Sequence, residues 1–382
     1  METQDQREAE QLVKLNGILD ANQQLARLAD LSRLPVMRKD KLLKTQTETP
    51  PFGGVPVKNV ANIYQSPGPV YEPGGASSDW WRFGRFLTSI GCGENDIAQN
   101  TFAYHFTPAG AMFESAAKSV GTTVFPAGPG NTRQQAEVAA TIGTTIYVGT
   151  PDYLAAILAK GDELGLDLSR INKAAVSAGP LFPQVRQTYE DRGIMCRQCY
   201  GTADTGLIAY ETAESTDGMI IDDGVIVEIV IPGTGTPMPD GEIGEVLVTV
   251  LNPDYPLIRF SVGDLSVIVP RASNDKTSRK RIAGWRGRAD QAAKVKGMFI
   301  RPEQVASLMS CHPEIQRARV EIDFDGSKDL ITVKVEATGG QPDAIQASVA
   351  EILKLRATVV QVADGVLPRD GVLVSDLRVM AN

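Results

Sequence analysis

The strongest constraint on the fold is an alternation of helical and apolar segments between residues 109 and 201. Helical periodicity predicts helices over 109–119, 131–141, 150–164 and 183–192. Short apolar runs bounded by Gly or Pro separate these helices: GTTVF, TTIYVG, NKAAVSAG and IMCRQCYG. Such runs between helices are typical of βαβ units whose parallel strands are buried on both faces. The segment therefore predicts an α/β fold.

The loops that follow these apolar runs are the expected place for a ligand. In sheets of this type, ligands bind beyond the carboxyl ends of the strands. The loops in question are PAGPGNT, GTPDY, SAGPLFP and YGTADTG.

The pattern changes twice further along the chain. Between about 218 and 270, the runs GVIVEIVIP, EIGEVLVTV and DLSVIVP are closely spaced and separated by turn residues, which predicts antiparallel hairpins. After residue 294, the order strand, helix, two strands, helix, strand is that of a small ferredoxin-like α+β domain. Two domains also suit 382 residues, since single cores stop growing near ~250–300 residues.

Composition and termini narrow the class of protein. No apolar run approaches the ~18 residues that a membrane span needs, and the start lacks the basic and apolar regions of a secretory signal. We therefore expect a cytoplasmic protein with no membrane partner. A net charge of −8 disfavours nucleic acid as a partner, because its binding depends on clustered Lys and Arg. The basic stretch 276–288 is the exception, and it suits either an anionic small ligand or a solvated loop.

The four cysteines are too sparse for a disulfide framework. Cys196 and Cys199 are spaced as a possible zinc pair, but the chain has no second close pair and only two histidines. Buried free thiols are the simpler interpretation, and a zinc site that recruits distant ligands is the alternative.

Three segments place reactive side chains at the ends of predicted elements. In CYGTADTGLIAYE, Asp204 can hold Mg²⁺ because hard cations prefer carboxylate oxygen. In YPLIRFSVGDLSVI, Asp264 can accept hydrogen bonds from a ribose diol. An ordinary turn is the alternative at both positions. The third segment, GWRGRADQAAKVKGMFIRPEQV, is a basic linker between the predicted domains and suits a nucleotide clamped during domain closure.

These segments resemble, in the same order, motifs of the adenylate-forming enzymes. YGTAD looks like the Tyr-Gly-x-Thr-Glu motif, and IRFSVGDL resembles Arg-Tyr/Phe-x-Thr-Gly-Asp-Leu. GRADQAAKVKGMFIRPEQV is similar to the hinge motif Gly-Arg-x-Asp-x-x-Lys-x-x-Gly-x-x-Ile/Val-x-Pro-x-x-Val. MFIRPEQV and the earlier KDKL…PPFGG resemble the phenylacetate-CoA ligase branch. The resemblance extends over nearly the whole chain.

The resemblance implies a large AMP-binding domain with parallel and antiparallel sheets over 1–288 and a mobile C-terminal domain over 289–382. It implies ATP, Mg²⁺ and coenzyme A as cofactors. The positions that it assigns to nucleotide binding are Ser177, Ala178, Gly179, Pro180, Tyr200, Gly201, Thr202, Asp204, Asp264 and Arg288.

Within this set, the resemblance gives roles to single residues. Asp204 takes the Mg²⁺ position, Asp264 holds the ribose hydroxyls, and Arg288 reaches ribose or phosphate. Asp290 is the pivot of the small domain. Tyr104 and His105 fall where the family lines its acyl pocket, although a core or turn role for His105 is equally open.

The departures from the family all concern the triphosphate. The segment 64–76, YQSPGPVYEPGGA, keeps glycines but lacks the expected run of hydroxyls and the lysine. Ala203 and Asp204 stand where threonine and glutamate are expected. Near the C-terminus, LPRDGVLVSDLR has Asp370, or a deletion, at the position of a lysine that stabilises charge on the α-phosphate.

Three functions remain open from the sequence, and no catalytic residue is assigned. The first is an ATP-dependent acid-CoA ligase that activates a small or aromatic carboxylate as an acyl adenylate, with Lys294, Lys296 or the 276–281 loop contacting phosphate. The second is a protein that binds an adenylate-like ligand without turnover. The third is transfer of the acyl group to an amine or carrier protein. A homodimer is possible in each case.

Overall fold

The computed structural model describes residues 3–66, 70–179, 181–270, 279–289, 293–295, 298–324, 329–339, 342–368 and 372–378. These residues form two compact units. The first contains Met1–Val262 and Ser266–Trp285, and the second contains Gly263–Leu265 and Arg286–Asn382. No helix of the described residues is long and apolar enough to span a bilayer.

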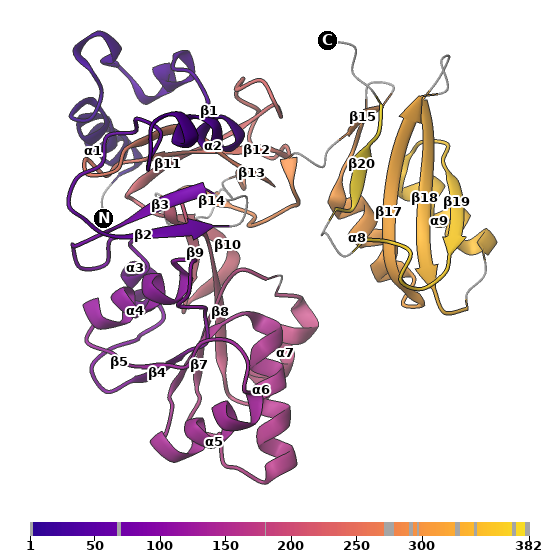
Figure 1. The fold of residues 1–382 in the computed structure, drawn as a ribbon, viewed down its shortest axis with the longest axis horizontal. Coiled ribbons are helices and arrows are strands. Elements are labelled where there is room, and N and C mark those ends of the chain that lie inside the picture. The colour runs from indigo at the N-terminus through magenta and orange to yellow at the C-terminus, as the bar shows by residue number, and fades with distance from the viewer. Residues whose placement is uncertain are drawn as a thin grey trace. The chain divides into compact units, whose positions relative to one another are not determined.

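The first unit is built around a sheet of eight described strands in the order β14-β10-β9-β8-β7-β6-β4-β5 (Figure 1). Its parallel strands are β4 (Ile97–Asn100), β5 (Thr123–Pro126), β6 (Ile146–Gly149), β7 (Lys173–Val176) and β8 (Met195–Thr202). Antiparallel pairing adds β9 (Gly206–Thr212), β10 (Ser215–Ile221) and β14 (Arg281–Ile282). The predicted α/β sheet is confirmed.

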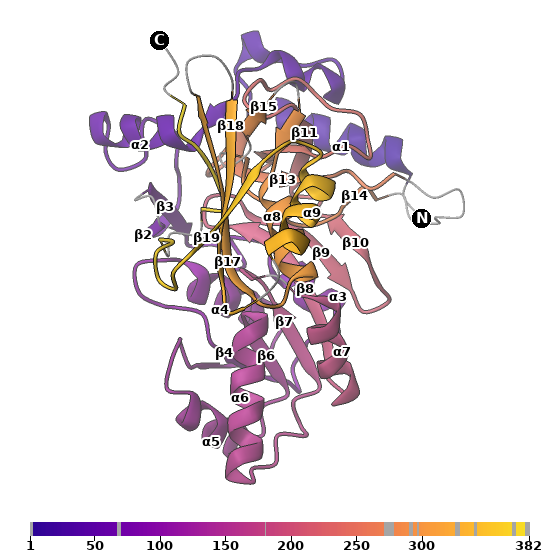
Figure 2. The same ribbon diagram turned by 90° about the vertical axis from the view of Figure 1, so that its right-hand side faces the viewer.

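Helices cover both faces of the parallel strands (Figures 1 and 2). Ile146, Val148 and Ala175 pack with α3 (Gly84–Ser89) and α4 (Ala109–Ser119). The alternate residues Tyr147, Ala174 and Val176 pack on the other face, in one cluster with side chains of three helices. These are α5 (Thr132–Ile142), α6 (Pro151–Leu164) and α7 (Pro183–Asp191). Strands buried on both faces explain the continuous apolar runs of the sequence.

Strand β4 has no counterpart among the predicted apolar runs, because half of its sequence, IAQN, is polar. Gln99 and Asn100 are 1% exposed. The Gln99 amide donates to Gln135 Oε1 at 2.8 Å, and Asn100 Nδ2 donates to the Gly110 carbonyl at 2.8 Å. Buried polar groups with such partners are tolerated in a core, but they hide the strand from a hydrophobicity pattern.

The first unit also contains a second sheet of four described strands, in the order β1-β13-β12-β11. These are β1 (Met37–Arg38), β13 (Leu257–Ser266), β12 (Gly244–Val250) and β11 (Val225–Val230), with β11 and β12 antiparallel as predicted. The N-terminal segment supplies α1 (Gln4–Asn16), the 3-10 helices η1 (Ala21–Gln23) and η2 (Leu28–Arg33), and α2 (Lys39–Glu48). A separate hairpin is formed by β2 (Val60–Ser66) and β3 (Val70–Gly75).

Hydrogen bonds of Arg259 in β13 connect the N-terminal segment to this second sheet. Its side chain is 2% exposed and pairs with both oxygens of Glu228, at 2.9 and 3.0 Å. The same guanidinium donates to the carbonyls of Ser32, Leu34 and Gly235. A buried guanidinium with five acceptors is fully satisfied, and the planar fork suits the bidentate carboxylate.

The second unit is an α+β domain. Its sheet has the order β19-β18-β17-β20, with α8 (Pro302–Cys311) and α9 (Pro342–Leu353) contributing to the same core. The strands are β17 (Ile315–Phe324), β18 (Asp329–Ala337), β19 (Thr358–Val362) and β20 (Val374–Asp376). One predicted strand is different: KVKGMFI forms the hairpin β15 (Ala293–Val295) and β16 (Met298–Ile300) and stays outside the sheet. The place beside β17 is taken by β20.

Arg259→Met is expected to lower the free energy of unfolding by about 2–4 kcal/mol, because it leaves the half-buried Glu228 carboxylate and three carbonyls without their donor. Urea denaturation measures the change. Arg133→Met is the control, since Arg133 is an exposed helix residue paired only with Glu137, and its loss should stay within about 0.5 kcal/mol. Equal effects of the two substitutions would contradict the anchoring role of Arg259.

Candidate functional site

The turn after β7 lies next to the end of β8, as the motif positions predict. Val176 pairs with Gln198, and the Ser177 hydroxyl donates to the Cys199 carbonyl at 2.9 Å. Tyr200 is the next residue of β8 and is 8% exposed. The structure therefore brings the Ser177 turn and Tyr200 together at the carboxyl edge of the parallel sheet, where a ligand is expected.

The backbone of this turn is strained at Ala178. Its φ is 60°, in the left-handed region that side chains with a Cβ rarely adopt. Gly179 follows, and Pro180 lies outside the described residues. Strain of this kind is found at functional sites more often than in ordinary turns.

The turn between β8 and β9 holds the other motif positions. The Thr202 and Thr205 hydroxyls are 2.9 Å apart, and the Thr202 hydroxyl also accepts from the Thr205 amide. A Cβ at Gly201 would lie 2.6 Å from the Gly206 carbonyl. Only glycine therefore fits at position 201, and the turn projects Asp204 to one side of the strand end.

Asp204 forms a buried cluster with residues to which the resemblance gave no individual role. Its carboxylate accepts from Lys39 Nζ at 2.9 Å, and the same amine lies 3.8 Å from Glu72 Oε1. Ser66 donates its hydroxyl to Glu72 and accepts from Lys39 at 3.4 Å. The Glu72 and Asp204 side chains are each 1% exposed, whereas Lys39 is 31% exposed. We call these four residues the acidic-pair cluster.

The acidic-pair cluster is short of positive charge and of hydrogen-bond donors. Glu72 Oε2 and Asp204 Oδ1 are buried and have no hydrogen-bond partner among the described residues. Burial first, and the neighbouring Asp204 charge second, raise the pKa of Glu72 to about 8. Burial and the charges of the same two carboxyls raise the pKa of the nearby phenol of Tyr255 as well. At neutral pH the raised pKa keeps Glu72 mostly protonated, and ionisation of both carboxyls would leave one negative charge without a cation in so dry a place.

The predicted phosphate-binding segment, 64–76, is a hairpin in the described residues and not an open loop. Its glycines in β3 are covered by aromatic rings: a Cβ on Gly75 would lie 1.8 Å from Trp80 Cε3, and one on Gly74 would lie 2.7 Å from Tyr64 Cε2. These two glycines therefore serve packing against rings. To the acidic-pair cluster, the hairpin contributes the polar side chains of Ser66 and Glu72.

Tyr104 and His105 have different environments. The Tyr104 hydroxyl accepts from Asn100 Nδ2 at 2.8 Å, and burial, followed by the Glu114 charge, raises the pKa of the phenol. Tyr104 thus faces the end of β4. His105 is exposed and makes no side-chain hydrogen bond with the described residues. Phe113, a further pocket candidate by type, is 3% exposed and stacks on Phe102 in the core.

Asp264 and Arg288 come together within the second unit. Arg288 Nη1 donates to Asp264 Oδ1 at 3.2 Å, and their backbones form an antiparallel bridge. Gly263 has a φ of 75°, and a Cβ there would lie 2.7 Å from Arg288 Nη2. Glycine is thus required for the arginine to approach. Asp290, the predicted pivot, lies outside the described residues.

The first described residues of the basic stretch lie near acidic partners, whereas Arg286 is exposed. Arg279 pairs with Asp223 at 2.8 Å and donates to the Tyr210 hydroxyl, and Lys280 lies 3.5 Å from Glu8. Residues 271–278, Lys296 and Asp370 lie outside the described residues, as does the side chain of Lys294. These positions stay predictions.

Cys196 and Cys199 are buried free thiols. Burial raises the pKa of Cys196 to about 12, and it also raises the pKa of Cys199. Within the described part of the chain, no group of three or more His, Cys, Asp or Glu is placed to hold a metal ion. The packing interpretation of the two cysteines therefore fits the structure.

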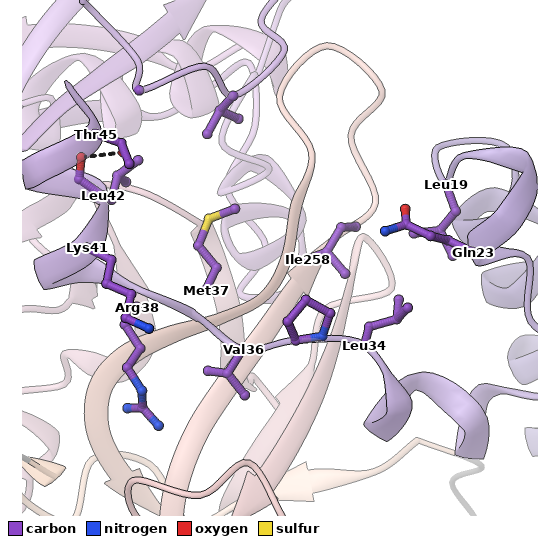
Figure 3. Close-up of a pocket in the computed structure, with 13 residues that line it drawn as sticks. Leu19, Gln23, Leu34, Val36, Met37, Arg38, Lys41, Leu42, Thr45 and Ile258 are labelled. Carbon is purple, nitrogen blue, oxygen red and sulfur yellow. Dashed lines mark hydrogen bonds between the residues drawn. The ribbon is translucent and has the colours of Figure 1, made fainter. Parts of the chain in front are cut away.

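A cavity of about 400 Å³ is lined in part by residues of the β1–α2 segment (Figure 3). Arg38 and Lys41 lie at one end of it and Leu19 and Gln23 at the other, with Ile258 and other apolar side chains between. Ile258 of IRFSVGDL and Lys41, Leu42 and Gly53 of KDKL…PPFGG line this cavity, whereas none of the described nucleotide-binding positions does. The same segment contributes to the acidic-pair cluster, because Lys39, the first residue of α2, lies between Arg38 and Lys41 in the sequence.

Sequence comparison finds relatives along most of the chain. A family model described as AMP-binding enzyme matches residues 83–250. Phenylacetate-coenzyme A ligase of Aromatoleum evansii is 29% identical over 350 residues, which cover 86% of this chain and 78% of the relative. The enzyme of the same name from Escherichia coli strain K12 is 29% identical over 81% of this chain and 73% of its own length.

Structural comparison confirms the fold. An open conformation of 2-hydroxyisobutyryl-CoA ligase, solved in complex with 2-HIB-AMP and CoA, superposes with a TM-score of 0.78. The match covers 96% of this chain and 91% of that one at 21% identity. At this identity the likeness is evidence for the fold alone.

Lys39→Met is expected to lower the free energy of unfolding by about 1–3 kcal/mol, because it leaves Asp204 as a buried carboxylate without a cation. Chemical denaturation in metal-free buffer measures the change. Lys44→Met is the matched control, since Lys44 lies on the same helix and is exposed. A loss no larger than that of the control would show that Lys39 does not neutralise the cluster.

Proposed function

The chain is a phenylacetate-CoA ligase-like adenylate-forming enzyme, and we propose that it joins a small or aromatic carboxylic acid to coenzyme A. In the first step, a carboxylate oxygen attacks the α-phosphorus of ATP. Pyrophosphate leaves, and an acyl adenylate is formed. In the second step, the sulfur of coenzyme A attacks the acyl carbonyl, AMP leaves, and the thiol proton passes to solvent. The observation that carries the proposal is the meeting of Ser177, Tyr200 and Asp204 at one sheet edge.

The adenosine contacts are proposed from two separate groups of residues. Ser177, Ala178, Gly179 and Tyr200 lie at the carboxyl edge of the parallel sheet, and we assign the adenine to them. The loop backbone can approach a flat base closely because the turn carries no large side chain before Pro180. Gly201 and Thr202 continue this surface into the turn that bears Asp204.

Asp264 and Arg288 are the proposed ribose contacts. A carboxylate accepts hydrogen bonds from both hydroxyls of a ribose diol, a pairing that also occurs in dinucleotide-binding folds. Asp264 accepts from Arg288, and a planar guanidinium is a residue type that recognises phosphate oxygens. Asp290 keeps its predicted role as the pivot of the second unit.

Asp204 is the proposed Mg²⁺ position. The oxygens of this residue fit a cation. Asp204 Oδ1 is buried and has no hydrogen-bond partner among the residues that the structure describes. Such an atom suits a hard cation, which commonly binds through one or two carboxylates plus phosphates and water. When bound, the cation would neutralise phosphate charge as pyrophosphate leaves.

The acyl group is assigned to the end of β4. Tyr104 presents a phenol whose hydroxyl is held by Asn100, and its ring offers an apolar face to an aromatic or small aliphatic acid. His105 is exposed, so its predicted contact with the acid would require the substrate to extend to the surface. A panel of small and aromatic acids would identify the substrate.

Binding without turnover is the second candidate function, and Glu72 favours it. A carboxylate in segment 64–76, where the resemblance places a lysine, repels a triphosphate unless a cation intervenes. Transfer of the acyl group to an amine or carrier protein differs only in the nucleophile of the second step. The homodimer, the absence of a nucleic-acid partner and the cytoplasmic location stay predictions.

Thioester formation should require ATP, Mg²⁺, coenzyme A and one of a panel of small and aromatic acids, and pyrophosphate release should precede it. Mass spectrometry detects the acyl-CoA, and a coupled assay follows pyrophosphate. Pyrophosphate without thioester, but with an amide when an amine is added, would move the protein to the third function. AMP binding without pyrophosphate for any acid would overturn the ligase and leave the binding function.

Asp264→Asn is expected to lower kcat/KM for ATP by roughly 10–100-fold, because a charge-assisted hydrogen bond contributes about 1.5–3 kcal/mol. Steady-state kinetics at varied ATP concentration measures the effect. Asp191→Asn serves as the control, since Asp191 is an exposed residue at the end of α7. An unchanged kcat/KM in the Asp264 variant would remove this residue from the nucleotide site.

A further inference from the structure

We propose that Glu72 is a second direct ligand of a divalent cation at Asp204, and that Lys39 occupies the place of this cation until the cation displaces it. The inference rests on the Mg²⁺ role proposed for Asp204 above. It adds a ligand from the hairpin β2–β3 and an ion exchange with a lysine.

The geometry of the acidic-pair cluster provides the donors. Lys39 Nζ is 2.9 Å from Asp204 Oδ2 and 3.8 Å from Glu72 Oε1, so one cation already contacts both carboxyls. The remaining oxygens, Glu72 Oε2 and Asp204 Oδ1, are buried and have no hydrogen-bond partner in the part of the chain that the structure describes. The Ser66 hydroxyl is a further oxygen within reach of the amine, at 3.4 Å.

Charge balance favours a divalent ion over the lysine. Two carboxyls whose side chains are 1% exposed face one ammonium, so ionisation of both leaves one negative charge unbalanced. A divalent cation would balance both charges at one point, and its preference for oxygen matches the donors. Two carboxylates do not make a complete cage, which agrees with Mg²⁺ sites that keep water and phosphate as their other ligands.

Lys39 is placed to leave without disturbing the core. Its side chain is 31% exposed, in contrast to its two partners, and it lies at the start of α2. Rotation of a four-carbon stem toward solvent breaks no backbone hydrogen bond. The displaced amine would stay close to the cation and could meet the phosphates of a nucleotide.

The exchange would also account for the lysine missing from segment 64–76. The hairpin contributes a carboxylate in place of a cation, and α2 contributes the positive charge from another part of the chain. Nucleotide and metal would then enter together, because the metal both neutralises Glu72 and releases Lys39.

Mn²⁺ binding to the full chain, without nucleotide or acid, tests the proposal. Electron paramagnetic resonance of free Mn²⁺ gives the affinity. We expect one site, weakened at least about tenfold by Glu72→Gln and by Asp204→Asn, and strengthened about tenfold by Lys39→Met, since each change removes one charge next to the ion. Glu48→Gln, an exposed carboxylate on α2, should bind as the unmodified protein does.

Thermal unfolding gives a second readout. Added Mg²⁺ should raise the Tm of Lys39→Met more than that of the unmodified protein, because the ion replaces the lost ammonium. Should Lys39→Met not fold, Lys39→Gln and the Glu72→Gln titration decide the question.

Either of two results with the variants would overturn the proposal: unchanged Mn²⁺ affinity in Glu72→Gln, or weaker binding when Lys39 is neutralised. Thioester formation by an enzyme that binds no Mn²⁺ alone would also overturn it while leaving the ligase function in place. Conversely, Mn²⁺ binding that follows the expected order in a chain without ligase activity would support the cation site and reject only the ligase.

Discussion

The hydrogen bonds of Arg259 are the interaction on which the arrangement of the first unit depends. This buried guanidinium joins Glu228 of β11 to the carbonyls of Ser32 and Leu34 in the N-terminal segment. Directly after that segment, β1 pairs in parallel with β13, and α2 begins at Lys39. The position of Lys39 beside Asp204 therefore follows from a network on the neighbouring sheet.

The same dependence gives the acidic-pair cluster its composition. Lys39 comes from α2, Ser66 and Glu72 from the hairpin β2–β3, and Asp204 from the turn after β8. A buried carboxylate is stable only with a cation or donors close by. Three separate parts of the chain must fold together before either carboxyl has one, so the cluster couples the N-terminal segment to the sheet edge that bears the nucleotide motifs.

The departures from the family motifs at 64–76 have a structural explanation. The hairpin at 64–76 turns its glycines toward Trp80 and Tyr64, and it brings a carboxylate where positive charge is expected. The described basic residues 279–281 are near acidic partners. The described residues of this hairpin therefore offer no glycine-rich loop of hydroxyls to a phosphate.

The sequence by itself determined the α/β sheet, the change to antiparallel hairpins and the α+β second unit, because burial on one or both faces leaves a periodic apolar pattern. It also located Ser177, Tyr200 and Asp204 at strand ends. Only the tertiary structure decided that β4 lies inside the sheet, since the buried amides of Gln99 and Asn100 are satisfied by partners outside the strand. It likewise decided that Lys39 and Glu72 meet Asp204, because a contact between residues 39, 72 and 204 leaves no periodicity in the chain.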